Sequence, residues 1–157
     1  MEKLWAPWRM EYILQEKPDG CIFCDKPRQD RDRDNLILHR GAGCFVIMNF
    51  YPYNNGHLMV VPYRHSADLA ALTAAEQSEM MALLGRCTTI LTQQMKPHGF
   101  NIGMNLGRTA GAGIDDHLHF HIVPRWNGDT NFMPITGHTN VLSQGLQESW
   151  DQLKPWV

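Results

Sequence analysis

The stretch of sequence that decides the fold is His117-Leu118-His119-Phe120-His121-Ile122-Val123. Histidine stands at every second position, and Leu118, Phe120 and Ile122 alternate with it. Side chains of a β-strand point to opposite faces in turn, so this pattern predicts a strand with three imidazoles on one face and apolar side chains on the core face. Neighbouring imidazoles would start about 6.5 Å apart along the strand, so one small ligand can contact two or three of them.

Two kinds of chemistry use imidazoles in this arrangement. Neutral imidazole is a common metal ligand, and a His-x-His pair on a strand can occupy two positions of a metal centre. An imidazole nitrogen can instead attack an electrophile such as phosphorus while neighbouring donors stabilise the developing charge. The spacing of the histidines is compatible with both, so their position alone does not decide.

Three further strands are expected upstream. Residues 36–39 and 44–48 are apolar runs joined through Gly41-Ala42-Gly43, which predicts a hairpin. Residues 51–56, YPYNNG, have the composition of a turn and lead into a third strand at 57–62. After the third strand, the spacing of the apolar residues changes from that of a strand to that of a helix.

One long helix is expected next. Thr73 and Glu76 have the spacing of a capping box, and the helix should end before Pro97. Its apolar positions recur at steps of three and four, which is typical of a helix packed on a core: Met80, Met81, Leu83, Leu84, Cys87, Ile90, Leu91 and Met95. A strand at 100–106, a glycine-rich turn at 107–116 and the histidine strand follow, the last ended by Pro124. Strands on either side of one helix predict an α+β domain with a mainly antiparallel sheet.

Length and composition fit one domain. The chain has 157 residues, 43% of them hydrophobic, and 14 Lys and Arg against 16 Asp and Glu give a net charge of −2. This balance excludes the broad basic surface of a nucleic-acid-binding domain. Residues 1–20 lack the apolar core of a secretory signal, and no stretch approaches the roughly 18 apolar residues of a membrane span. We therefore expect a cytoplasmic protein with no nucleic-acid or membrane partner.

The four cysteines, in a chain without a signal peptide, indicate a reducing compartment rather than disulfides. Cys21 and Cys24 form a Cys-x-x-Cys pair, which in such a protein indicates zinc or redox chemistry, and no thioredoxin-like βαβ pattern surrounds it. Cys44 and Cys87 lie in apolar runs and are expected to be buried thiols. The polar stretch 25–34, DKPRQDRDRD, is expected to be a solvated loop.

The histidine strand resembles the signature of the histidine triad (HIT) family, His-φ-His-φ-His-φ-φ, and Pro124-Arg125 continues it. The pair Asn49 and His57 and the segment 61–65, VPYRH, also resemble the family, and the likeness runs from about Cys21 to Trp126. Both ends of the chain look like the branch of diadenosine tetraphosphate phosphorylases and fragile-histidine-triad hydrolases. The resemblance implies one HIT domain over 1–157, with an extension at 1–20, a core at 21–126 and a C-terminal segment at 127–157. Its HIT-like fold would be a five-stranded, mainly antiparallel sheet with one long and one short helix.

The resemblance also implies an activity, the cleavage of a nucleoside phosphate ester or anhydride through a nucleotidyl-histidine intermediate. By position in the motif, His119 would attack the α-phosphorus. His121 and His57 would line the phosphate, and His117 would support the site or bind metal. A neutral imidazole is nucleophilic near pH 7, which fits the role of His119.

The resemblance also implies which residues contact the substrate. Asn49 matches a ribose-contacting residue, and Asn105 resembles a residue that contacts the phosphates, although its spacing to His119 is longer than in the family. Ala112 and Gly113 offer no side-chain donor where many relatives have one, so Gly113 would act through its backbone N–H. Water and inorganic phosphate both remain as acceptors of the nucleotidyl group.

Several histidine triad proteins bind a structural zinc ion through a Cys-x-x-Cys pair and two histidines. Matched onto this sequence, the ligands would be Cys21, Cys24, His65 and His117, a closed tetrahedral set. The resemblance also implies a homodimer formed through the long helix and a sheet edge.

Three hypotheses about function remain at this point. The main one is a nucleotidyl hydrolase or transferase acting on a dinucleoside polyphosphate or a nucleoside phosphoramidate. The second is a catalytically silent nucleotide-binding sensor module. The third is a metal-centred hydrolase or lyase with His117, His119 and His121 as ligands. The Asn49 and His57 context favours the first, because a generic metal strand does not require it.

Overall fold

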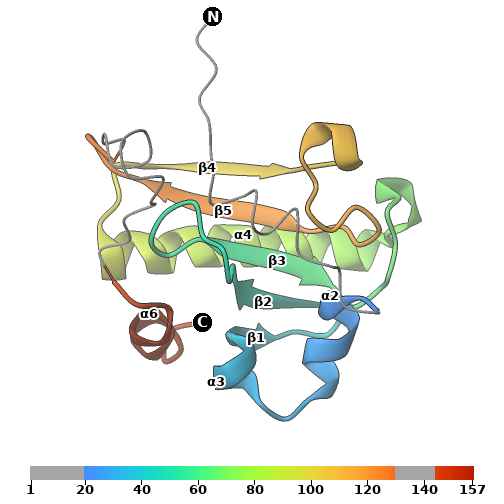
Figure 1. Cartoon of the computed structure of the whole chain (residues 1–157), viewed down its shortest axis with the longest axis horizontal. Helices are drawn as coiled ribbons and strands as arrows, with labels where there is room; N and C mark the ends of the chain where they lie inside the picture. The colour runs from blue at the N-terminus through green and yellow to red at the C-terminus, as the bar shows by residue number, and fades with distance from the viewer. Residues whose placement is uncertain (1–19, 130–143) are drawn as a thin grey trace, which may run out of the picture.

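The computed structural model describes residues 20–129 and 144–157, and the core of the described part is one five-stranded antiparallel sheet (Figure 1). The spatial order of the strands is β1-β2-β3-β5-β4. Their bounds are Ile37–Arg40 for β1, Cys44–Met48 for β2, Leu58–Pro62 for β3, Gly99–Met104 for β4 and Phe120–Arg125 for β5. The predicted α+β class with a mainly antiparallel sheet is confirmed.

The central strands β2 and β3 are buried along their whole length. They pair in continuous register from Cys44 opposite Pro62 to Met48 opposite Leu58. The predicted hairpin is confirmed, because β1 pairs antiparallel with β2. Its turn is fastened by Glu79, whose carboxylate accepts hydrogen bonds from the backbone N–H groups of Ala42 and Gly43 at 2.7 Å each.

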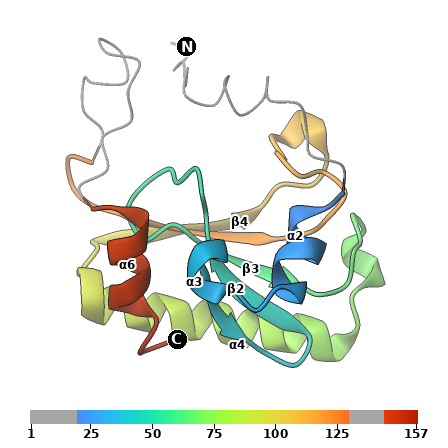
Figure 2. The same ribbon diagram turned by 60° about the horizontal axis from the view of Figure 1, so that its bottom comes forward.

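The predicted long helix is α4, Ala74–Met95, which crosses one face of the sheet (Figures 1 and 2). Its capping box is formed as expected: the Glu76 N–H donates to Thr73 Oγ1 at 3.2 Å, and the Thr73 N–H donates to Glu76 Oε2 at 2.7 Å. Lys96 then adopts a left-handed conformation, which ends the helix before Pro97. One apolar position was wrongly assigned to the core, since Met81 is 62% exposed.

The histidine strand begins later and ends later than the sequence pattern predicts. Regular pairing starts only at Phe120, and β5 continues through Pro124 to Arg125. Pro124 is tolerated because β3 pairs with β5 only as far as Ile122, so residue 124 has a strand partner on one side alone. The prediction that Pro124 ends the strand was therefore wrong.

The polar stretch 25–34 was predicted to be a loop, but it contains short helical turns. These are α2 (Ile22–Asp25), η1 (Lys26–Arg28) and α3 (Asp32–Asn35). The Arg40 guanidinium holds the segment against the sheet edge, because it donates to Asp32 at 2.7 Å and to the Pro27 carbonyl oxygen. The charges in this stretch alternate in sign without the period of a helix, so the sequence did not predict these helical turns.

The short helix α6, Leu146–Leu153, packs near β1 and α4 (Figure 1). Trp150 Nε1 donates to the Ile37 carbonyl oxygen at 3.1 Å, and Lys154 Nζ donates to that of Leu38 at 2.8 Å. Two 3-10 turns complete the described elements, η2 (Leu69–Ala71) and η3 (Arg108–Ala110). Residues 1–19 of the extension predicted at 1–20 and residues 130–143 of the segment predicted at 127–157 lie outside the described residues. Among the helices described, none is long and apolar enough to cross a membrane.

Candidate nucleotide site and metal centre

His119 is a buried, neutral imidazole whose lone pair is oriented by the backbone. Its side chain is 5% exposed, and Nδ1 lies 2.9 Å from the His117 carbonyl oxygen. A carbonyl only accepts, so Nδ1 carries the proton and Nε2 carries the lone pair. Burial also lowers the pKa of His119 below its usual range, which keeps the ring neutral near pH 7. Nε2 of His119 is therefore suited to nucleophilic attack.

His121 is oriented by a chain of hydrogen bonds that starts at Tyr53. The Tyr53 backbone N–H donates to His57 Nδ1 at 3.1 Å, so in neutral His57 the proton lies on Nε2. That Nε2 is 3.0 Å from His121 Nδ1 and donates to it. The remaining proton of His121 then lies on its own Nε2. Its ring centroid is 4.7 Å from that of His119, so a ring that carries an N–H donor lies next to the ring that carries the lone pair.

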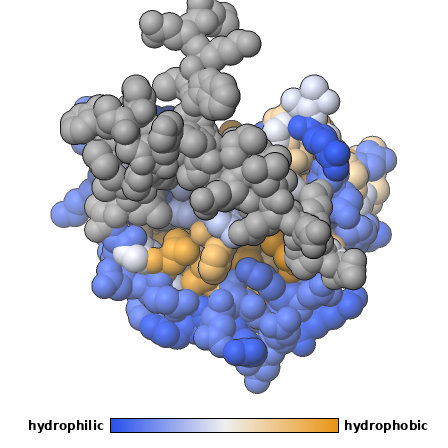
Figure 3. Space-filling view, in the orientation of Figure 1, coloured by the Kyte–Doolittle hydropathy of each residue, from blue (hydrophilic) through white to orange (hydrophobic). Residues whose placement is uncertain are grey.

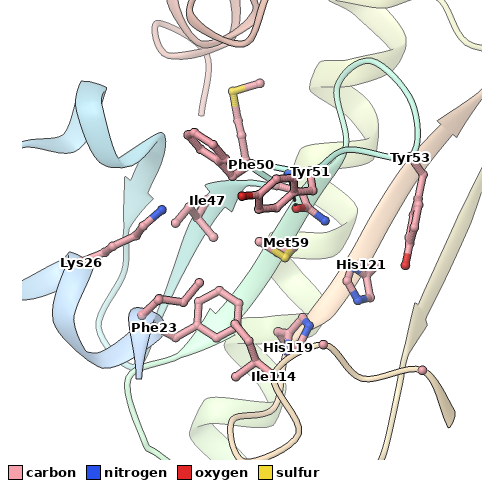
Figure 4. Close-up of a pocket in the computed structure, with 15 residues that line it drawn as sticks. Phe23, Lys26, Ile47, Phe50, Tyr51, Tyr53, Met59, Ile114, His119 and His121 are labelled. Atoms are coloured by element: carbon pink, nitrogen blue, oxygen red, sulfur yellow. Dashed lines mark hydrogen bonds between the residues drawn. The ribbon is translucent and has the colours of Figure 1, made fainter. Parts of the chain in front are cut away.

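His119 and His121 line a pocket on the sheet face opposite α4 (Figure 4). Hydrophobic surface is visible at the centre of this face, next to a hydrophilic area (Figure 3). The apolar part of the pocket wall consists of Ile22, Phe23, Ile47, Met48, Phe50, Met59 and Ile114. The other lining residues are Lys26, Asn49, Tyr51, Tyr53, Gly111 and Gly113. An apolar cleft lined by a few polar groups is typical of a site for a small organic ligand.

The predicted site residues divide into those on the pocket wall and those behind it. Asn49 and Gly113 lie on the wall with His119 and His121. His57 does not line the pocket: it is 1% exposed and contacts His121 from behind.

Asn49 and Asn105 are both tied to nearby groups. Asn49 Oδ1 accepts from the Tyr51 N–H at 2.9 Å, and its Nδ2 lies 3.4 Å from His57 Nδ1. Asn49 therefore orients the turn that carries Tyr51 in addition to lining the pocket. Asn105 is not among the lining residues, and its amide donates to the Gly111 carbonyl oxygen at 3.4 Å.

Sequence reasoning missed most of the pocket wall. Ile22, Phe23 and Lys26 come from α2 and η1, and Phe50 and Tyr51 come from the turn after β2. No spacing in the sequence links these two segments. The run of aromatic residues in that turn was the one available signal, since exposed aromatic side chains often mark binding surfaces.

A second cluster lies beside the pocket and has the composition of a metal centre. One ligand atom from each of Cys21, Cys24, His65 and His117 lies within 4.8 Å of the other three. The His117 Nε2–H donates to the Pro62 carbonyl oxygen at 2.8 Å, so its Nδ1 keeps a lone pair that faces the cysteines.

The distances within this cluster fit a tetrahedral zinc ion. Zinc bonded to two sulfur and two nitrogen ligands requires about 3.4 Å between the nitrogens and about 3.6 Å between nitrogen and sulfur. The two Nδ1 atoms are 3.3 Å apart, and the Sγ atoms of Cys21 and Cys24 lie 3.2 and 3.6 Å from His117 Nδ1. Burial raises the pKa of the Cys21 thiol to about 11, so a thiolate there needs a nearby cation. The residues present fit the ion.

The three triad histidines themselves do not form a metal centre. His117 directs its lone pair toward the cysteines, whereas His119 and His121 turn toward the pocket. Among the described residues, the cysteine and histidine cluster is the group able to hold a metal ion, and His119 and His121 are not part of it. The metal-centred hypothesis with all three histidines as ligands is wrong.

Phe23 connects the two sites. It is 1% exposed and lies on α2 between the two cysteines. Its ring is 5.4 Å from that of His117 and 4.9 Å from that of His119, centroid to centroid. Whatever positions α2 therefore also positions the wall behind the nucleophile.

The fold and the pair of sites define a histidine triad protein, and comparison with known proteins agrees. The HIT domain model matches residues 31–128, so the chain belongs to this family. It is 40% identical to an AP-4-A phosphorylase of Mycobacterium tuberculosis, over 95% of this chain and 80% of that protein. It is 26% identical to an adenosine 5'-monophosphoramidase of Candida albicans, over 68% of this chain and 70% of that protein.

Solved structures give the same family. A zinc-bound histidine triad family protein from Mycobacterium smegmatis superposes with a TM-score of 0.69 at 25% identity, covering 87% of this chain and 91% of that one. The resemblance drawn from the histidine strand is confirmed, and so is the HIT-like fold.

Proposed function

We propose that the protein is an enzyme that cleaves a dinucleoside polyphosphate, such as diadenosine tetraphosphate, at the α-phosphorus through a covalent nucleotidyl-histidine. One observation carries this proposal: His119, whose Nε2 holds the lone pair, and His121 line the same apolar pocket with their ring centroids 4.7 Å apart. The relationship to the AP-4-A phosphorylase supports the choice of substrate.

The reaction proceeds in two displacements. His119 Nε2 donates its electron pair to the α-phosphorus, a P–N bond forms, and the bond to the bridging oxygen breaks. The departing oxygen keeps that electron pair, and the His121 N–H stabilises its charge. An acceptor oxygen from water or inorganic phosphate then attacks the same phosphorus. The P–N bond breaks, its electron pair returns to His119, and the acceptor's proton is lost to the site or to solvent.

The remaining residues have supporting roles. His57 keeps the His121 proton on Nε2, because its own Nε2–H occupies His121 Nδ1. Asn49 contacts the ribose, Gly113 offers a backbone N–H to the phosphates, and Asn105 supports the glycine-rich turn through Gly111. His117 lies outside the pocket and acts as a metal ligand two residues before His119.

A structural zinc ion held by Cys21, Cys24, His65 and His117 belongs to this proposal. The tetrahedral fit of the four ligand atoms and the zinc-bound relative support it. Such an ion supplies positive charge that keeps the thiols ionised and ties α2 to the region of β3 and β5. The four side chains thereby hold Phe23 against the ring of His119.

We also propose how the chain is organised into a domain, how it assembles and where it acts. Residues 1–157 form one HIT domain, with a core at 21–126 flanked by an extension at 1–20 and a segment at 127–157. The chain forms a homodimer through α4 and the exposed edge strand β4, where Ile102 is 48% exposed. It works in the cytoplasm on nucleotides, without a nucleic-acid or membrane partner.

Product analysis tests the activity and identifies the acceptor. Diadenosine tetraphosphate is incubated with the protein, with and without inorganic phosphate. ADP and ATP formed only when phosphate is present identify a phosphorylase, and AMP and ATP formed without it identify a hydrolase. Turnover of adenosine 5'-phosphoramidate in place of both would support the phosphoramidate hydrolase, which the relationship to the Candida albicans enzyme favours. Tight nucleotide binding without any turnover would instead support a silent sensor module.

A further inference from the structure

Lys26 is the one cationic side chain among the described residues that line the pocket. It is half-buried on η1, and its neighbours on the wall include Ile22, Ile47 and Phe50. Its Nζ lies 5.8 Å from the centroid of the Phe50 ring. Within residues 20–129 and 144–157, Nζ makes no hydrogen bond and no ion pair. Keeping an ammonium group partly out of water is costly unless a partner compensates it.

The place of Lys26 in the pocket indicates which part of a ligand it meets. Figure 4 shows Lys26 on the opposite side of the pocket from His121, with Ile47 and Met59 between them. If the α-phosphate of a nucleotide lies at His119, the apolar wall that runs past Met59 and Ile47 toward Lys26 is the surface available to its base. The base edge, and not the phosphate, is then the part of the nucleotide that reaches Nζ.

We propose that Lys26 donates a hydrogen bond to an acceptor on the edge of the nucleobase and thereby determines the base preference of the site. This inference rests on the proposed function, because it takes the pocket to be the nucleotide site. An ammonium group can only donate, so it favours a base edge that presents acceptors. Guanine presents O6 and N7 side by side, whereas adenine pairs N7 with a donating amino group. Lys26 therefore raises the affinity for guanine relative to adenine.

The test uses Lys26→Met, which keeps the apolar stem and removes the ammonium group. Arg28→Met is the matched control, because it removes one positive charge from the same turn but at an exposed residue outside the pocket wall. Dissociation constants of AMP and GMP are measured by calorimetry for the wild-type protein and both variants. Values of kcat/KM are measured with diadenosine and diguanosine tetraphosphate.

We expect Lys26→Met to weaken GMP binding roughly tenfold and AMP binding by less, because a hydrogen bond to a charged donor is lost. The loss in kcat/KM should lie mainly in KM, and Arg28→Met should match the wild type. Equal losses for the two bases would overturn the proposal and identify a phosphate contact, and unchanged binding would also overturn it. If the wild-type protein turns over neither dinucleotide, the proposed function fails, while the GMP to AMP ratio still decides the role of Lys26.

Discussion

Replacement of His119 by alanine tests the covalent mechanism most directly. The change removes the Nε2 lone pair, the hydrogen bond to the His117 carbonyl oxygen at 2.9 Å and the ring contacts with Phe23 and His121. Loss of the hydrogen bond costs about 1 kcal/mol and loss of each ring contact about as much, so the free energy of unfolding should fall by about 3 kcal/mol. Domains of this size are stable by roughly 5–15 kcal/mol, so the variant should remain folded.

Activity should respond far more strongly than stability. Without the nucleophile, kcat should fall by at least roughly 10³-fold, because the covalent route is closed. Nucleotide affinity should change little, since the apolar wall and Lys26 remain. Rapid quenching followed by intact-mass measurement should detect a nucleotidyl adduct on the wild-type protein and none on the variant. His98→Ala is the control, because His98 is exposed and lies outside the pocket.

Two results would refute the argument. One is near-normal turnover by His119→Ala. The other is an adduct of normal amount in the variant, which would place the nucleophile on another residue. Urea unfolding of both variants shows whether a loss of activity merely reflects a loss of the fold.

The remaining predictions concern the metal, protonation and assembly. Metal analysis should find about one zinc per chain in the wild-type protein and in Cys87→Ala, and almost none in Cys21→Ala; full zinc in Cys21→Ala would contradict the ligand set. The pKa of His119 should lie below 6.5 in the folded protein, because burial disfavours the charged ring. Between that pKa and 6.5 the unfolded chain binds the proton first, so His119 lowers stability as pH falls below about 6.5. Long-range ¹H–¹⁵N NMR through the titration should show protonated Nδ1 and bare Nε2 at neutral pH, and a pKa above 6.5 would contradict this. Light scattering should give the mass of a dimer, and a monomer at all concentrations would reject the proposed interface.

Local patterns in the sequence were enough to predict most of the fold. The period of two in the histidine strand and the capping box at Thr73 are properties of neighbouring residues, and both predict their elements within a few residues. The predictions were wrong at positions where contacts with distant segments of the chain determine the structure. Pro124 remains in β5 because the pairing of β3 with β5 ends at Ile122. Met81 is exposed because the sheet covers only one stripe of α4.

Some features of the candidate site also follow from the sequence, whereas others depend on the tertiary structure. The sequence by itself determined that three imidazoles alternate with apolar residues along one segment and, through the family resemblance, which one is the expected nucleophile. Only the tertiary structure decided which nitrogen of each ring carries the proton, because His119 and His121 take their tautomers from a carbonyl group and from His57. It also brought Lys26 and Phe50 to one pocket and gathered two cysteines with two histidines. The physical reason is the separation along the chain of the residues that interact. Strand and helix periods follow from local backbone geometry, whereas hydrogen-bond partners, burial and ligand sets depend on segments that meet only when the chain folds.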